Sequence, residues 1–194
     1  MDIEKRLLAA DLRVERREGD APKIRGYAAV FGQLSEDLGG FREQLVAGAF
    51  ADAVSRDDVR ALINHDPNLV LGRNRAGTLV MREDGNGLAV EITPADTQYA
   101  RDLLVLMERG DVTQMSFAFT VSKEDQAWER QGQGPWIRTI KRVNRLYDVS
   151  VVTYPAYPQT QAAVRALEEV QRAQPPARNP RLGALIDLIT RPAK

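Results

Sequence analysis

Short runs of strand-forming residues, separated by turn signals, dominate residues 1–153 and constrain the fold more than any other feature. These runs alternate between apolar and polar residues or are rich in β-branched and aromatic residues, as half-buried strands are. We expect strands at residues 12–17, 23–32, 41–46, 59–65, 78–83, 88–93, 114–120, 136–146 and 147–153. Helical patterns are fewer, at residues 48–55, 97–109 and 162–172. This order predicts a mostly β fold with some α, namely an antiparallel β-barrel flanked by helices.

The helix expected at residues 97–109 has one apolar stripe at helical spacing and ends at Gly110. We interpret the stripe as core, and it consists of Ala100, Leu103, Leu104 and Met107. Residues 84–87, Asp-Gly-Asn-Gly, lack the later ligands of an EF-hand and predict a hairpin turn with positive φ. Residues 124–135 are polar and end in Gly-Gln-Gly-Pro, which predicts a hairpin loop. The lone Gly-x-Gly in this segment lies outside a strand-to-helix turn and is therefore no nucleotide-binding motif.

The expected strand at residues 114–120 has two different faces. Its bulky apolar face, which should lie on the core, consists of Met115, Phe117 and Phe119. The opposite face is small and carries Ser116, so we expect the hydroxyl to stand over open space with rigid support behind it. A nucleophile needs that arrangement, but an isolated strand serine has it too. Ser116 therefore becomes a catalytic candidate only if the chain supplies partners.

The composition of the chain limits which residues could act together with Ser116 in catalysis. The chain has no cysteine and one histidine, His65, which excludes disulfides, cysteine nucleophiles and metal sites with two histidine ligands. His65 ends an expected strand just before Asp66-Pro67, where a surface or capping role is the alternative. If the protein uses a histidine as a base near neutral pH, His65 is therefore the only candidate. We expect no cofactor and no metal.

The third group of a catalytic set should be a carboxylate that holds the imidazole, because no second histidine remains. Asp66 is a poor choice, since neighbouring residues of an extended chain point to opposite faces. Asp148 is better placed, at the start of a strand-like run that could pair beside the Ser116 strand. Glu43 and Asp111 stay open, because spacing alone does not decide among them.

Charge and hydropathy exclude other function classes. Lys and Arg number 27, and so do Asp and Glu, which argues against a nucleic-acid partner. No apolar run approaches the ~20 residues of a membrane span. The first residues lack the basic and apolar segments of a signal peptide. We therefore expect neither a nucleic-acid nor a membrane partner.

The end of the chain has a different composition. A helix at residues 162–172 precedes a Pro-rich linker at 174–180 and a further apolar helix face. That face consists of Leu182, Leu185, Ile186 and Ile189. This helix either packs on the chain's own domain, or it binds a partner or is removed by cleavage. The sequence leaves both alternatives open. We expect residues 1–160 to form one domain and residues 161–194 a helical tail.

Five short segments in order resemble the prohead protease family of tailed bacteriophages, whose members mature capsid precursors. They are Gly26–Gly32, Glu43 with Gly48–Phe50, Asn64–Asp66 with Leu71–Arg73, Met115–Phe119, and Leu146–Tyr157. The resemblance spans roughly residues 24–160. It implies that His65 and Ser116 are the catalytic pair.

The same resemblance implies a fold similar to that of the herpesvirus maturation proteases, which use a Ser-His-His set. This chain departs from that set because it has one histidine. Asp148 stands where the phage family often has Glu, so an acid one methylene shorter is implied as the third member. Ala118 stands where the family often has Gly.

The resemblance implies a serine endopeptidase enclosed in the immature capsid, or prohead, in the host cytoplasm. Its substrates would be the scaffold protein or the scaffold-like part of the major capsid protein, and then the protease itself. Self-association is a further expectation. A non-catalytic assembly or scaffold module on the same fold is the alternative. A hydrolase of small esters is another, although the chain lacks the Gly-x-Ser-x-Gly elbow of its commonest form.

Overall fold

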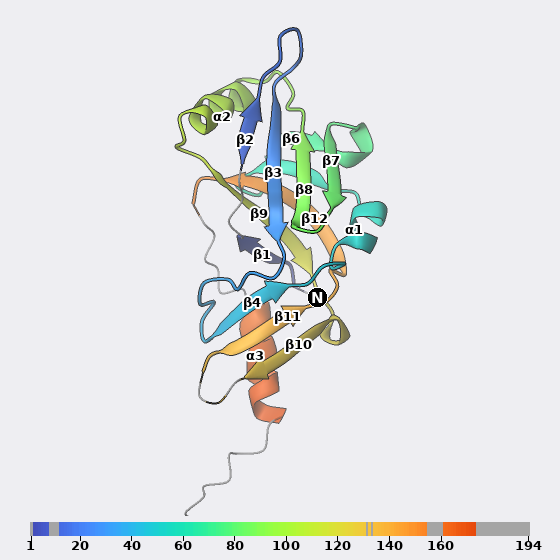
Figure 1. Cartoon of the computed structure of the whole chain (residues 1–194), viewed down its shortest axis with the longest axis vertical. Coiled ribbons are helices and arrows are strands. Elements are labelled where there is room, and N and C mark those ends of the chain that lie inside the picture. The colour runs from blue at the N-terminus through green and yellow to red at the C-terminus, as the bar shows by residue number, and fades with distance from the viewer. Residues whose placement is uncertain (1, 8–11, 131, 133, 155–160, 174–194) are drawn as a thin grey trace, which may run out of the picture.

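The computed structural model of the chain describes residues 2–7, 12–130, 132, 134–154 and 161–173 (Figure 1). Its helices are α1 (Ala51–Arg56), α2 (Gln98–Glu108) and α3 (Gln161–Ala173), with short 3-10 turns η1 (Asn74–Ala76) and η2 (Lys123–Asp125). The first six strands are β1 (Glu4–Leu7), β2 (Arg13–Glu15), β3 (Lys23–Val30), β4 (Phe41–Leu45), β5 (Arg60–Ile63) and β6 (Asp66–Arg73). The others are β7 (Leu79–Glu83), β8 (Gly87–Ile92), β9 (Gln114–Thr120), β10 (Gln126–Arg130), β11 (Trp136–Ile140) and β12 (Arg145–Val152). A mostly β chain with few helices was expected, and this is confirmed.

The strands pair into three sheets. A five-stranded sheet has the order β1-β9-β12-β5-β6, a four-stranded sheet β2-β3-β8-β7, and a three-stranded sheet β10-β11-β4. Most pairs are antiparallel, but β12 with β5 and β11 with β4 are parallel. The main core combines apolar residues of the four-stranded sheet, such as Ile24 and Ile92, with those of the five-stranded sheet, such as Phe117 and Val149.

The expectation of a closed barrel is corrected to three open sheets among the described strands. A barrel closes only when its first and last strands are hydrogen-bonded to each other. Here β1 and β6 end the five-stranded sheet without pairing together. The apolar faces are buried by packing one sheet over another instead. The likeness to herpesvirus proteases stays a prediction.

Helix α2 matches the expectation closely. Thr97 caps its first turn by accepting a hydrogen bond from Ala100 N at 3.4 Å. The helix ends before Gly110, whose φ of 83° is the left-handed geometry typical of a helix stop. The whole expected stripe is buried, namely Ala100, Leu103, Leu104 and Met107.

Three strands occupy segments for which no strand was expected, and the first of them is β1 at the start of the chain. Strand β6 begins at Asp66 and contains Pro67, whereas the sequence indicated a stop there. Strand β10 lies inside the polar residues 124–135, where a loop was expected. All three strands are at the edge of their sheets. An edge strand tolerates a proline and a polar composition because one of its sides needs no partner.

The turn at residues 84–87 joins β7 to β8, as expected, but not through positive φ. No residue of this turn is among those with positive φ. Asp84 instead accepts hydrogen bonds from the backbone N–H groups of Asn86, at 2.8 Å, and Gly87, at 3.2 Å. Gly87 is required by contact, since a Cβ there would lie 2.0 Å from the carbonyl oxygen of Ala29.

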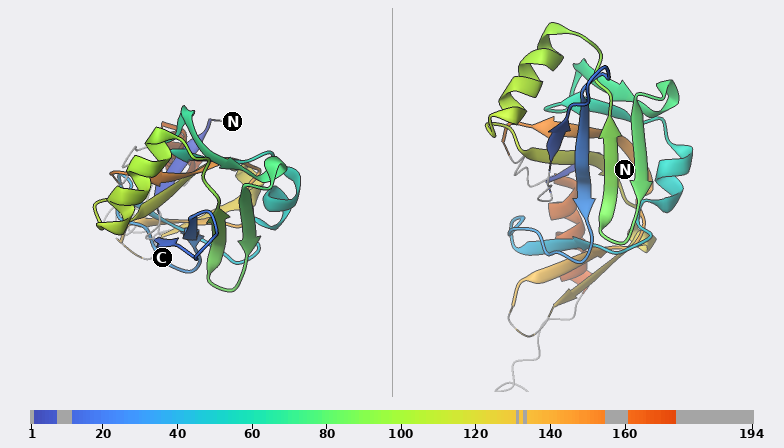
Figure 2. Two further views of the ribbon diagram at one scale, coloured as in Figure 1. Left: turned by 90° about the horizontal axis from the view of Figure 1, so that it is seen from above. Right: turned by 45° about the horizontal axis from the view of Figure 1, so that its top comes forward.

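Helix α3 packs on the three-stranded sheet, at the end of the molecule opposite to α2 (Figures 1 and 2). Ala163 and Leu167 of the helix form a small apolar cluster with Phe41 and Trp136. The described part of the expected tail therefore contacts the strands before it. The Pro-rich linker and the apolar face at residues 182–189 lie outside the described residues, and the domain boundary at residue 160 stays a prediction.

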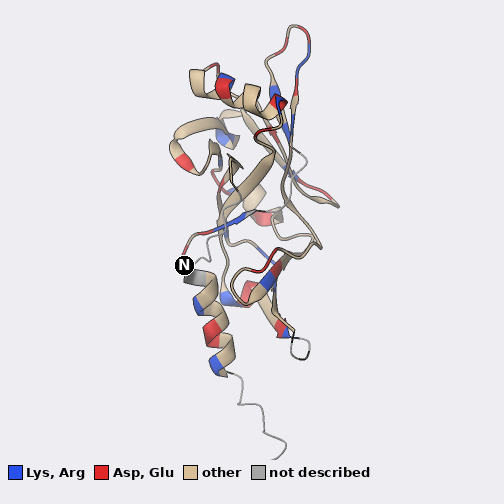
Figure 3. Cartoon of the chain, turned by 90° about the vertical axis from the view of Figure 1, so that its left-hand side faces the viewer, with Lys and Arg blue, Asp and Glu red and all other residues tan. Residues whose placement is uncertain are grey.

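Basic and acidic residues are interspersed on α2, α3 and the strands (Figure 3), in keeping with the balanced composition. None of the described helices combines the length and the apolar character needed to cross a bilayer.

Candidate active site

His65 lies in the tight turn between β5 and β6. Asn64 and His65 have φ values of 51° and 58°, and Ile63 pairs with Asp66 across the turn. Two successive positive φ values between paired residues are what a type I′ hairpin turn requires. Asparagine tolerates this conformation, but histidine does so less readily. The sequence placed His65 at a strand end correctly, without indicating this backbone.

Asn64 fastens the turn to β12. Its backbone N–H donates to Val151 O at 2.9 Å. Its side-chain oxygen accepts from Thr153 N at 2.9 Å, and its amide nitrogen donates to Thr153 Oγ1 at 3.1 Å. Because β12 also carries Asp148, these bonds hold the imidazole and the carboxylate on one rigid unit. Sequence reasoning missed Asn64, for which the Asn-His-Asp segment was the available signal.

Ser116 lies on β9 between two neighbouring strands, opposite Leu7 of β1 and Ser150 of β12. The expected division of faces is confirmed on the apolar side, where Met115, Phe117 and Phe119 lie in the main core. The expectation of open space over Ser116 is wrong, since the residue is 0% exposed. Strands flank it on both sides and an imidazole rests on its hydroxyl, so the small face is enclosed.

A β-bulge places Asp148 on the same face as Ser116. Leu146 pairs with Phe119, but Asp148 pairs with Ala118, so Tyr147 is an extra residue in β12. Leu146 and Val149, three residues apart, both lie in the main core. Simple alternation cannot place them both there, and the bulge resolves the conflict.

The structure brings His65, Ser116 and Asp148 into one hydrogen-bonded chain. His65 Nδ1 lies 2.6 Å from Asp148 Oδ1, and His65 Nε2 lies 2.7 Å from Ser116 Oγ. The histidine and aspartate side chains are 4% and 12% exposed. An ionised carboxylate can only accept, so it assigns the proton of a neutral imidazole to Nδ1 and leaves the Nε2 lone pair facing the hydroxyl. This arrangement can take a proton from Ser116.

The other three carboxylates considered from the sequence have different partners. Asp66 accepts from Asn68 N at 2.8 Å, and Asp111 pairs with Arg109 at 3.1 Å. Glu43 lies in a buried charge cluster, bonded to arginines. Of the four candidates, Asp148 is the one whose hydrogen bond to His65 appears in the described part of the chain.

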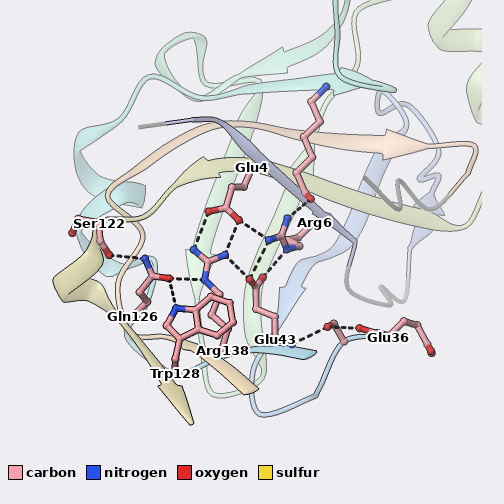
Figure 4. A network of polar contacts seen from close by, with 10 residues as sticks. Glu4, Arg6, Glu36, Glu43, Ser122, Gln126, Trp128 and Arg138 are labelled. Carbon is pink, nitrogen blue, oxygen red and sulfur yellow. Dashed lines mark hydrogen bonds and ion pairs between the residues drawn. The ribbon is translucent and has the colours of Figure 1, made fainter. Parts of the chain in front are cut away.

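The buried charge cluster, defined as Glu4, Arg6, Glu43 and Arg138, links β1 to the three-stranded sheet (Figure 4). Glu4 accepts from Arg138 at 2.6 and 2.9 Å, and Glu43 accepts from Arg6 at 2.8 Å and from Arg138 at 2.8 Å. Burial by itself would raise the pKa of Glu4. The hydrogen bond and charge of Arg138, together with Arg6, outweigh this effect, so that the pKa of Glu4 is lowered overall. Both carboxylates are thus matched by cations in the interior.

This charge cluster supports the candidate site from one side. Glu4 and Arg6 belong to β1, which pairs with β9 up to the register position of Ser116. Sequence reasoning missed β1 and the cluster. Alternating charges at a chain end normally indicate a solvated face, and only long-range packing buries them.

Known proteins resemble this chain over most of its length. A family model described as the caudovirus prohead serine protease matches residues 10–173. The prohead protease of Enterobacteria phage HK97 is 30% identical over 158 residues, which are 79% of this chain and 63% of that protein. The chain thus spans somewhat less than two thirds of that relative's length.

The solved structure of the bacteriophage T4 capsid assembly protease is also similar, with 14% identity and a TM-score of 0.43. The match covers 78% of this chain and 99% of that one, but its TM-score is too low to support an inference. The family match extends over most of the sequence and includes all three residues of the hydrogen-bonded chain. This protein belongs to the caudovirus prohead serine protease family.

Proposed function

We propose that this protein is a serine endopeptidase that acts through Ser116, His65 and Asp148. The observation that carries the proposal is the continuous contact from carboxylate to imidazole to hydroxyl, at 2.6 and 2.7 Å, in a member of a serine protease family. Serine is a weak nucleophile until an adjacent base takes its proton, and this contact provides that base.

In the proposed reaction, neutral His65 accepts the Ser116 proton as Oγ attacks the carbonyl carbon of a peptide bond. Asp148 holds the Nδ1 proton and stabilises the imidazolium. The imidazolium then gives its proton to the leaving amine, and the acyl group stays on Ser116. Water attacks the acyl-enzyme with His65 again as base, which restores the hydroxyl and releases the acid. Backbone donors to the oxyanion are expected to contribute about 3 kcal/mol each.

We infer that the substrates are capsid assembly proteins. The relative from phage HK97 is named a prohead protease, which supports a role in capsid maturation. The finer proposal is that the enzyme cleaves the scaffold protein, or the scaffold-like part of the major capsid protein, and then itself, inside the prohead. The tail, residues 161–194, would then tether the enzyme to an assembly partner or be removed by self-cleavage.

Co-expression with the major capsid protein of the same phage tests this function. Intact masses of both proteins are compared between the wild type and Ser116→Ala. Ser55→Ala is a matched control, because Ser55 is an exposed serine on α1. Cleavage that persists in the control and disappears in Ser116→Ala supports the proposal. The proposal is contradicted if the masses are the same for the wild type and both variants while capsid shells still assemble.

The second candidate, a non-catalytic assembly module, is favoured by one observation. Ser116 is 0% exposed, so a substrate reaches its hydroxyl only if neighbouring residues move. This candidate predicts assembly without cleavage, and no labelling of Ser116 by a fluorophosphonate. Mass spectrometry of the labelled protein therefore separates the two functions.

A further inference from the structure

Ser150 is a buried hydroxyl beside the candidate site that the proposed reaction does not use. It lies on β12 directly opposite Ser116 in the strand pairing and is 0% exposed. The same alternation that places Asp148 on this face places Ser150 there, two residues later.

The hydroxyl of Ser150 contacts both members of the carboxylate–imidazole pair. Its Oγ donates to Asp148 Oδ1 at 2.6 Å and lies 3.3 Å from His65 Nδ1. A serine hydroxyl has one proton, and here that proton is given to the carboxylate. The Ser150 oxygen can then only accept from Nδ1. Asp148 Oδ1 thus receives two donors, and the Nδ1 proton has two acceptors.

We propose that Ser150 is a positioning residue that completes this site as a fourth member. The proposal rests on the proposed function. With two donors on one oxygen, the Asp148 carboxylate cannot rotate without losing a hydrogen bond. A carboxylate fixed in this way keeps the Nδ1 proton in place and the Nε2 lone pair on Ser116. A carboxylate held in this position beside Nδ1 also stabilises the imidazolium that forms in the reaction.

A purely structural role is the competing explanation, since a small buried side chain is often a spacer between strands. Ser122 provides a matched control for it. Ser122 is also buried, and its hydroxyl donates to the carboxylate of Asp125, away from the site. Removing either hydroxyl leaves a carboxylate with one donor fewer, so both alanine variants should lose similar stability.

Kinetics give the first measurement, with cleavage of the capsid protein as the assay. We expect Ser150→Ala to lower kcat by about 10- to 100-fold with KM little changed, as for loss of a hydrogen bond to a charged group. Ser150→Thr keeps the hydroxyl and should restore most of the activity. Ser122→Ala should keep the wild-type kcat. A wild-type kcat in Ser150→Ala overturns the proposal.

NMR of the single histidine gives a second measurement that needs no proteolysis. Protein labelled with ¹⁵N-histidine in a Ser116→Ala background yields one imidazole spectrum, because His65 is the only histidine. We expect a low-field Nδ1–H resonance that moves upfield and exchanges faster with water when Ser150 is replaced by alanine. Ser122→Ala should leave it unchanged. An unchanged resonance in Ser150→Ala, even with reduced cleavage, assigns Ser150 a structural role and overturns the proposal.

The two measurements separate failure of this inference from failure of the proposed function. If the wild type cleaves nothing but the resonance responds to Ser150→Ala, the positioning contact stands and the protease is wrong. If Ser150→Ala does not fold, Ser150→Thr decides the matter. The role of the hydroxyl is contradicted if Ser150→Thr folds but loses the low-field Nδ1–H resonance of His65. It is also contradicted if the kcat of this variant falls by as much as we expect for Ser150→Ala.

Discussion

The side-chain amide of Asn64 bonds to both the backbone N–H and the hydroxyl of Thr153, at 2.9 and 3.1 Å. Asn64 precedes the candidate base and Thr153 follows β12, so one amide fixes the position of His65 relative to Asp148. The amide also stabilises a turn whose two central residues have positive φ.

Replacing Asn64 should separate the amide contacts from the backbone requirement. Asn64→Gly accepts the positive φ but lacks the amide, so we expect kcat to fall by at least about 10-fold with a modest loss of stability. Asn64→Ala should be about 1 kcal/mol less stable than Asn64→Gly, because alanine is strained in this conformation. Peptide-cleavage kinetics and urea unfolding measure the two effects. A wild-type kcat in both variants would show that the amide contacts do not position His65.

Asp148→Asn should lower kcat by about 10⁴-fold, because an amide does not hold the imidazole in the required tautomer as a carboxylate does. Asp111→Asn is the matched control, since Asp111 pairs with Arg109 and not with His65. His65→Ala should be nearly as inactive as Ser116→Ala, because members of such a set act as a unit. Single-turnover cleavage assays measure these losses. Full activity in Asp148→Asn would exclude Asp148 as the third member.

Breaking the buried charge cluster should destabilise the fold strongly. Glu43→Gln leaves Arg6 and Arg138 with too little negative charge in the interior, which typically costs about 3–5 kcal/mol. Glu169→Gln is the control, because its ion pair with Lys123 is exposed. Urea denaturation at pH 7 should show a large drop in unfolding free energy for the first variant and little change for the second. Equal midpoints would mean that the cluster adds nothing to stability.

The Asp58–Arg73 pair at the base of the β5–β6 hairpin should make stability depend on pH. The hydrogen bond from Arg73 lowers the pKa of Asp58 to about 2, against about 3.9 in an unfolded chain. A carboxylate whose pKa is lower in the folded state stabilises the fold at pH values above the unfolded pKa. This stabilisation falls as the pH drops from about 4 to about 2 and is lost below that.

Urea unfolding of the wild type and Asp58→Asn between pH 2 and pH 6 tests this dependence. The difference in unfolding free energy should be constant at the upper end and shrink through the window between the two pKa values. A difference that stays constant down to pH 2 would rule out the shift.

Gly85 and Gly87 provide a matched pair in the β7–β8 turn. Gly87→Ala places a Cβ 2.0 Å from Ala29 O, so backbone must move, and we expect a loss of about 1–3 kcal/mol. Gly85→Ala meets nothing within 4 Å and should be close to neutral. Thermal unfolding of both variants measures the contrast. Equal stability of the two would contradict the close approach of β8 to β3.

Local patterns were enough to predict several parts of this protein. The stripe of α2 is readable because helix periodicity is a property of neighbouring residues, and Gly110 ends the helix for a local reason as well. The alternation of Met115, Phe117 and Phe119 likewise gave the buried face of β9. The pair of His65 and Ser116 followed from there being one histidine and from the resemblance of short segments.

Only the tertiary structure decided which carboxylate meets His65, and it did so through contacts between distant segments. Asp148 reaches the imidazole because a bulge in β12 and the Asn64 contacts set the register, and neither is visible in spacing. The enclosure of Ser116, the hydroxyl of Ser150 and the burial of Glu4 have the same origin. Local sequence sets which face a side chain takes along its own strand, whereas what covers that face depends on strands that pair across the whole chain.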